Sequence, residues 1–142
     1  MEKLLFDSGI KTYKVGAGAL KFNPTDPNLY ARFLDLEPQL ERLQQALSQK
    51  TAQATDARSL LKALEDTDRQ LKTLLTQVFG EENDFSKLLC GVNLLSTAGN
   101  GLSVAENLLA ALEPVLERGA ERFVESKTAD AREKARQRRE NL

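Results

Sequence analysis

The amino-acid sequence predicts a mainly α-helical protein of the α+β class, built as a kinked helical bundle with a small N-terminal β-hairpin and a long C-terminal helix. Two observations support this fold class. Aromatic residues make up only 6% of the 142 residues and tryptophan is absent, so leucine and alanine must build the core, which favours packed helices over a β-sandwich. Leucines also recur at alternating spacings of three and four, the period of one helix face.

The β-hairpin is predicted from residues 10–15 and 19–22, two short runs with β-branched or aromatic residues between polar ones. Gly16, Ala17 and Gly18 between them supply the permissive backbone of a hairpin turn. An apolar run at residues 4–6 is a candidate for an additional strand. Because an isolated hairpin is only marginally stable in water, it must lie on helices or on another copy of the chain.

The first helix is expected to begin at Pro27, with Thr25 or Asp26 as its N-cap. Pro38 is expected to kink or split this helix after about three turns. Its apolar stripe, which Tyr30 and Leu34 widen, is interpreted as intramolecular core in preference to a coiled-coil seam. The stripe consists of Leu29, Phe33, Leu36, Leu40, Leu43 and Leu47.

A polar connection at residues 48–55 is expected to fold the second helix back antiparallel. That helix should run from about Asp56 to Phe79, with Gly80 as its C-terminal stop. A short helix around residues 85–90 follows, in which Cys90 is interpreted as a buried structural thiol. A long final helix is expected to start near Leu102 and to bend at Pro114.

The domain prediction is a single helical domain over residues 1–124, with the hairpin at about residues 4–23. Residues 125–142 are predicted to form a charged, helix-prone C-terminal tail, because the apolar pattern stops after Val124 and the tail cannot bury a face of its own.

The composition restricts the chemistry that this chain can perform. It contains no histidine, which removes Ser-His-Asp and Cys-His catalysis and the usual zinc sites. The glycines of the hairpin turn lack the helix-opening third glycine of a dinucleotide loop, and Ser103 has no histidine to activate it. The acidic residues at 81–84 lack the ligand spacing of a calcium loop. We therefore expect a non-enzymatic protein without a cofactor or a metal ion.

The charge balance and the single cysteine indicate the surroundings of the protein. The net charge is −1, from 20 basic and 21 acidic residues, which argues against binding nucleic acid or an anionic membrane by charge alone. One cysteine excludes an internal disulfide and fits a reducing compartment. The apolar part of residues 1–10 is too short for a signal peptide, and Asp7 interrupts it, so we expect a cytosolic protein that does not enter the membrane.

The basic tail leaves three interpretations open. Arg132, Arg136 and Arg139 fall on one side of the predicted helix. A solvated helix end is the favoured interpretation, and a docking arm for a protein partner is the next. Nucleic-acid binding is the least favoured, because Glu133 and Glu140 lie between the arginines and no aromatic residues are present for base stacking.

Four stretches occur in an order that resembles one protein family. They are FNPTD at 22–26, leading into a helix with Tyr30, Arg32 and Phe33, VFGE at 78–81, LCGVNL at 89–94 and GLSV at 101–104. In this order, and over nearly the whole chain, the sequence resembles the small tail assembly chaperone-type proteins of siphophages and prophages, which are encoded between the tail-tube and tape-measure genes.

The resemblance implies a non-enzymatic function in the cytoplasm of the bacterial host. Such a protein is expected to bind the tape-measure protein and to help recruit tail-tube protein, either as a homo-oligomer or in many copies on its client. Alternatives are a structural tail or virion adaptor and a nucleic-acid-binding regulator that uses the basic tail. The candidate partner-binding residues are Tyr30, Phe33, Leu109, Leu112, Arg132, Arg136 and Arg139.

Overall fold

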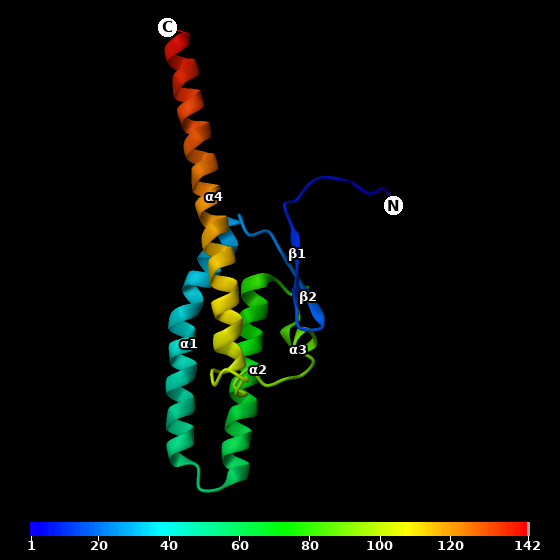
Figure 1. The fold of residues 1–142 in the computed structure, drawn as a ribbon, viewed down its shortest axis with the longest axis vertical. Helices are drawn as coiled ribbons and strands as arrows, with labels where there is room; N and C mark the ends of the chain where they lie inside the picture. Colours follow the sequence, from blue (N-terminus) through cyan, green and yellow to red (C-terminus); the bar gives the residue numbers. More distant parts are fainter. Residues whose placement is uncertain (142) are drawn as a thin grey trace.

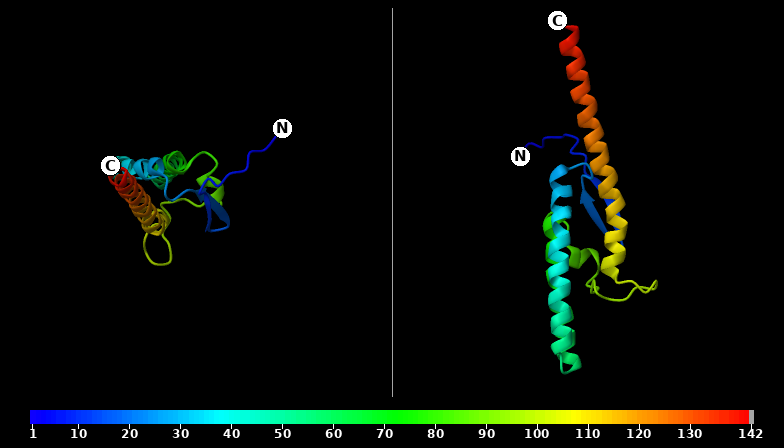
Figure 2. Two further views of the ribbon diagram at one scale, coloured as in Figure 1. Left: turned by 90° about the horizontal axis from the view of Figure 1, so that it is seen from above. Right: turned by 90° about the vertical axis from the view of Figure 1, so that its left-hand side faces the viewer.

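The computed structural model describes residues 1–141 and has the predicted class, a mainly helical chain with one N-terminal hairpin (Figure 1). Three long helices form the body, and the hairpin and a short helix cover one side of it (Figures 1 and 2). The elements in chain order are β1 (Lys11–Val15), β2 (Gly18–Phe22), α1 (Pro27–Gln53), α2 (Ala57–Phe79), α3 (Phe85–Leu88) and α4 (Val104–Glu140).

The hairpin forms as predicted, with Val15 paired to Gly18 across the turn. Gly16 has a φ of 57°, in the left-handed region that a tight hairpin turn requires and that glycine adopts without strain. Leu20 and Phe22 of β2 are buried in the core. The additional strand suggested for residues 4–6 is wrong: these residues have no strand partner, because β1 is already paired to β2 and no other strand lies beside them.

The outer edge of β2 is occupied by a side chain, Asn83, which is 4% exposed. Its Oδ1 accepts a hydrogen bond from the Lys21 N–H at 2.9 Å, and its Nδ2 donates to the Lys21 carbonyl oxygen at 2.9 Å. The same Nδ2 donates to the Phe79 carbonyl oxygen at 2.8 Å, at the end of α2. The amide thus substitutes for a third strand and joins the hairpin to α2.

Both long helices of the α1–α2 pair begin at aspartate N-caps. Asp26 accepts a hydrogen bond from the Asn28 N–H, and Pro27 occupies the first turn, as predicted. Asp56 caps α2, and its hydrogen bonds with the Ser59 side chain and backbone N–H lower the pKa of its carboxyl group. The polar connection is shorter than expected, because α1 continues through the helix-compatible residues after Leu47 and ends only at Gln53.

Neither of the two helix-internal prolines splits its helix, so of the two effects expected at Pro38, a kink or a split, the split does not occur. Both α1, with Pro38, and α4, with Pro114, are continuous. Each proline lies on an exposed face. The carbonyl that loses its N–H partner is that of Leu34 or Ala110, also on exposed residues, so water can satisfy it.

The middle of α2 fixes the loop that leads to α4. Asp68 accepts a hydrogen bond from the Leu94 N–H at 2.7 Å and forms an ion pair with Lys72 at 2.9 Å. Leu94 is fully buried as a result. The polar residues in this part of α2 therefore have a structural role, namely to hold an irregular segment against the helix.

Cys90 is exposed, so the prediction of a buried thiol is wrong. Leu88, not Cys90, is the residue of this segment that packs into the core, and only 7% of its surface is exposed. The chain then reverses through Cys90, whose φ is 52°, and this left-handed residue directs the segment away from the core.

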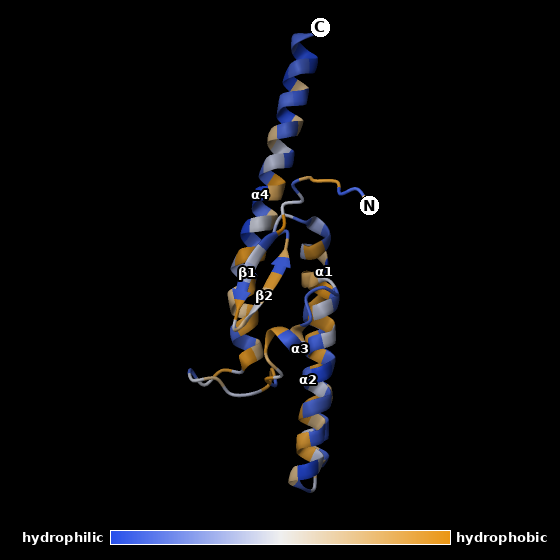
Figure 3. Cartoon of the chain, turned by 90° about the vertical axis from the view of Figure 1, so that its right-hand side faces the viewer, coloured by the Kyte–Doolittle hydropathy of each residue, from blue (hydrophilic) through white to orange (hydrophobic). Residues whose placement is uncertain are grey.

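The first half of α4 packs on the body, and its second half extends beyond it (Figure 1). Gly119 is the point of closest approach, because a Cβ at this position would overlap the carbonyl group of Pro24, just before α1. From residue 125 to residue 140 every side chain but Ala135 is exposed, and Figure 3 shows this end as predominantly hydrophilic.

Replacement of Asn83 by alanine should lower the free energy of unfolding by about 2–4 kcal/mol, because it removes the partner of the partly buried Lys21 N–H and carbonyl groups and of the buried Phe79 carbonyl group. Urea denaturation followed by circular dichroism measures this. Asn28→Ala, at an exposed asparagine in the first turn of α1, is the control and should change stability by less than about 0.5 kcal/mol. Equal effects of the two substitutions would contradict the role assigned to Asn83.

Gly119→Ala should destabilise the protein by about 1–3 kcal/mol, although alanine normally favours a helix by about 1 kcal/mol over glycine. The reason is the overlap of the new methyl group with the Pro24 backbone. The converse substitution at an exposed α4 position, Ala110→Gly, measures the helix-propensity contribution alone. A Gly119→Ala protein with a higher melting temperature than the wild type would show that α4 does not approach Pro24 closely.

Candidate protein-binding surface

A groove runs between α1 and α4 on the side of the body away from the hairpin. The right-hand view of Figure 2 faces the side on which these two helices run next to each other, with the hairpin behind them. The groove has a volume of about 240 Å³. Its lining residues come from the N-terminal half of α1 and the first half of α4, and they are Tyr30, Phe33, Leu34, Leu36, Glu37, Leu40, Leu109, Glu113 and Glu117.

The floor of the groove is apolar because the stripe on α1 is wider than its contact with the core. Leu29 and Leu36 are buried beneath, whereas Tyr30 and Phe33 are only partly buried. Leu34, at the edge, exposes 55% of its surface. Apolar surface is therefore left in contact with water where α1 and α4 separate, a common feature of binding surfaces.

The rim of the groove is acidic. Glu37 of α1 and Glu113 and Glu117 of α4 are exposed lining residues, and the lining contains no lysine or arginine. None of the three glutamates forms an ion pair within the described residues. An apolar floor with a negative rim fits a guest that carries apolar side chains flanked by basic ones.

Three of the sequence-predicted partner-binding residues meet in this groove: Tyr30, Phe33 and Leu109. Leu112 lies elsewhere, in the core, with 6% of its surface exposed. The acidic rim was not predicted. The spacing of Glu113 and Glu117 from Leu109 places all three on one helix face, and this is the signal that could have identified it.

The three predicted arginines of the tail lie on the projecting half of α4, away from the groove. Arg136 is bound within its own helix, to Glu133 at 2.6 Å and to Glu140 at 3.5 Å. Arg132 and Arg139 are exposed on the same helix. The acidic residues between the arginines therefore neutralise part of the positive charge, as the sequence predicts.

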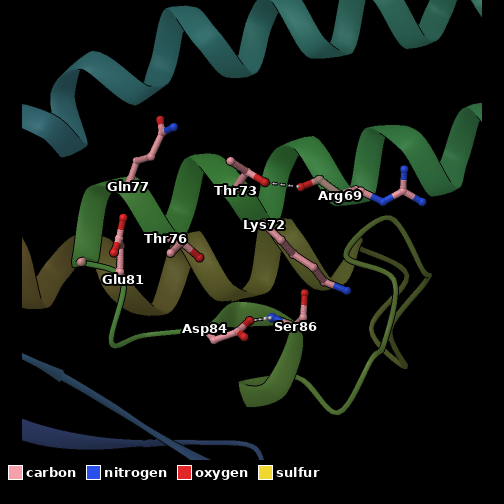
Figure 4. A pocket seen from close by; sticks show the side chains of 9 residues that line it. Arg69, Lys72, Thr73, Thr76, Gln77, Glu81, Asp84 and Ser86 are labelled. Atoms are coloured by element: carbon pink, nitrogen blue, oxygen red, sulfur yellow. Dashed lines mark hydrogen bonds between the residues drawn. The ribbon is translucent and has the colours of Figure 1, made fainter.

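A second hollow, of about 570 Å³, lies beside α2 and α3 and is lined by polar residues and one glycine (Figure 4). Its polar groups have structural partners. Lys72 pairs with Asp68, Asp84 accepts a hydrogen bond from the Ser86 N–H as the cap of α3, and the Thr73 hydroxyl donates to the Arg69 carbonyl oxygen. In Figure 4 the dashed lines join Thr73 to Arg69 and Ser86 to Asp84, which are two of these structural contacts.

A third depression, between α1 and α2, differs from the α1–α4 groove in its charge. It has a volume of about 580 Å³, an apolar strip that includes Leu43 and Leu74, and two arginines, Arg42 and Arg69. Helix α1 thus has apolar surface on two sides. The side toward α4 is bordered by negative charge, and the side toward α2 is bordered by positive charge. Of these three hollows, the α1–α4 groove is the one lined by residues that the sequence predicts to bind a partner.

Within residues 1–141, no helix is long and apolar enough to cross a bilayer. In the same range no three histidine, cysteine or acidic side chains come together as metal ligands could.

The comparisons with known proteins assign no family to this fold. No family model, no curated protein and no solved structure matches the chain.

Proposed function

We propose that this chain is a non-enzymatic assembly chaperone that covers an apolar stripe of a client helix with its α1–α4 groove. The observation that carries the proposal is the groove itself, in which Tyr30, Phe33 and Leu109 form a partly exposed apolar floor inside an acidic rim. A volume of about 240 Å³ is below the usual range of small-molecule sites, about 300–1,000 Å³, and suits one or two side chains of a larger partner.

A helix is the favoured guest because the groove is the seam between two antiparallel helices. A third helix can lie along such a seam and insert side chains at spacings of three and four, the helix-in-groove mode of recognition. The three glutamates favour a client whose apolar stripe is flanked by lysine or arginine, since charge complementarity fixes orientation and accelerates encounter.

The client that we propose is the tape-measure protein of a siphophage or prophage, with tail-tube protein recruited to the resulting complex. The basis for this choice is the sequence resemblance, from the Phe22–Asp26 stretch to the entry into α4. The physical argument agrees with it, because a long helical client exposes apolar stripes until it is enclosed, and many copies of a small grooved protein can cover them.

The proposal is tested by co-expression of the tape-measure protein of the same phage with this chain or with Leu34→Asp. The soluble fraction of the client should rise with the wild-type chain and fall back about tenfold with the variant, because an aspartate at the groove edge must lose its hydration to contact an apolar stripe. Leu34 is 55% exposed, so the substitution should leave the fold intact.

Leu61→Asp is the matched control, at a leucine of α2 that is 61% exposed and does not line the groove. It should protect the client as well as the wild type does. The proposal fails if the client is no more soluble with the wild-type chain than without it, or if the two aspartate variants behave alike.

A further inference from the structure

We propose that the free edge of β1, on the side of the hairpin opposite the edge that Asn83 closes, binds an extended acidic segment of a partner protein as an additional strand. This site is separate from the α1–α4 groove, because the hairpin lies behind the face on which that groove runs (Figure 2). It therefore does not depend on the proposed function.

The hydrogen bonds of Asn83 establish which backbone groups of the hairpin face outward. Asn83 binds both the N–H and the carbonyl oxygen of Lys21, so these two groups point away from β1. Lys21 is paired with Thr12 in the antiparallel sheet, and the pair is thus one whose members do not bond to each other. The N–H and the carbonyl group of Thr12 therefore point away from β2, and the two-residue period gives those of Lys14 the same direction.

The outward-facing groups of β1 have no partner among residues 1–141. No third strand lies beside β1, and the hydrogen bonds of the turns, loops and caps in this part of the chain do not involve Thr12 or Lys14. Both residues are exposed. The fold therefore closes one edge of the sheet with a buried amide and leaves two donors and two acceptors open on the other edge, where an extended chain can pair with them.

A hollow of about 470 Å³ lies beside this edge, between β1 and α4. Its lining includes Lys11 and Tyr13 of β1 and no residue of β2, so it is on the open side of the hairpin. The α4 wall consists of Val115, Arg118, Glu121, Arg122 and Glu125. Because side chains of a strand alternate between two faces, every second side chain of an added strand would point toward this hollow.

The charge of the hairpin favours an acidic strand. Residues 11–22 contain three lysines, Lys11, Lys14 and Lys21, and no acidic residue. None of these lysines forms an ion pair within the described residues. The two arginines and two glutamates of the α4 wall balance each other, so the lysines determine the sign. Opposite charges on adjacent strands stabilise a sheet, whereas like charges directly opposite each other destabilise it.

The nearest acidic residues in the sequence lie away from the open edge. They are Asp7, in the turn before β1, and Glu81 and Glu82, which precede the side chain that closes the edge of β2. Residues 1–10 do not fill the hollow either, because they leave the hairpin on the side away from α4 (Figure 1).

The open edge suits a heterologous protein strand better than a second copy or a nucleic acid. Pairing of β1 with β1 of another copy would place the lysines of both copies in one sheet, and lysine at a strand edge opposes such self-pairing. Phosphate groups accept hydrogen bonds but cannot donate them to the carbonyl groups of Thr12 and Lys14. A strand satisfies the donors and the acceptors together.

The test uses a fluorescein-labelled peptide of about eight residues, a usual strand length, in which glutamate and valine alternate. Fluorescence anisotropy measures its affinity for the full chain. The same peptide methylated on every backbone nitrogen keeps its charge but cannot donate a hydrogen bond, so it should bind at least about tenfold more weakly. A peptide of alternating lysine and valine should not bind, because the lysines of the hairpin repel it.

Thr12→Pro removes one donor of the open edge and should also lower the affinity at least about tenfold. Its N–H points away from β2, so the hairpin itself should form. Thr12→Ala retains the N–H and is the matched control, with an affinity within about twofold of the wild type. Lys14→Glu should weaken binding as Thr12→Pro does, whereas Lys50→Glu, at an exposed lysine near the far end of α1, should not.

Amide exchange followed by NMR locates the contact without any substitution. In the free protein the N–H groups of Thr12 and Lys14 should exchange quickly, and those of Tyr13 and Val15, which pair with β2, slowly. The glutamate–valine peptide at saturation should slow the exchange of Thr12 and Lys14.

Four results would overturn the inference. They are no binding of the glutamate–valine peptide, equal affinity of the methylated peptide, equal affinities of Thr12→Pro and Thr12→Ala, and unchanged exchange of Thr12 and Lys14 in the complex. Slow exchange of these two amides in a dimer of the protein alone would assign the edge to a second copy. Tighter binding of an oligothymidylate than of the peptide, with the same amides slowed, would assign it to nucleic acid, and either outcome also contradicts the proposal.

Discussion

The close approach of Gly119 to Pro24 determines how α4 lies on the rest of the protein. A side chain at position 119 would overlap the Pro24 backbone, so only glycine lets α4 contact the segment that leads into α1. Helices α1 and α4 run antiparallel from this contact. The apolar groove lined by Tyr30, Phe33 and Leu109 lies between them. A larger residue at 119 would displace α4 and change the width of the groove, so the candidate binding surface depends on one missing methyl group.

The hairpin and the loops are held by single polar side chains, because the chain has too few strands and aromatic residues to hold them otherwise. Asn83 takes the place of a third strand beside β2, and Asp68 binds the backbone of Leu94. Around them Tyr13, Phe22, Phe79 and Phe85 form a chain of ring contacts with centroid separations from 4.7 to 5.8 Å. Four of the eight aromatic residues therefore lie on this side of the body, whereas the groove on the opposite side is lined by Tyr30, Phe33 and four leucines.

Periodicity and capping residues predicted the helices, because Asp26, Asp56 and Ser103 act locally, through hydrogen bonds to the next turn. The contacts of Asn83 and Asp68 were not predictable, since they join residues 62 and 26 positions apart and no spacing rule connects them. The split considered at Pro38 does not occur, because the effect of a proline depends on whether the freed carbonyl faces water, and the position of that carbonyl depends on the fold. The stripe on α1 predicted the apolar residues that α1 contributes to the groove. Glu113 and Glu117 were missed, although their spacing from Leu109 places them on the same helix face.

Hydrogen exchange with and without a fragment of the tape-measure protein tests most directly the claim that the α1–α4 groove is the client-binding surface. Binding should slow exchange in the helix turns that line the groove, residues 30–40 and 109–117, and leave the distant end of the α1–α2 pair, residues 50–60, unchanged. Protection confined to the projecting end of α4 or to the α1–α2 depression, or no protection at all at saturating fragment, would contradict the account.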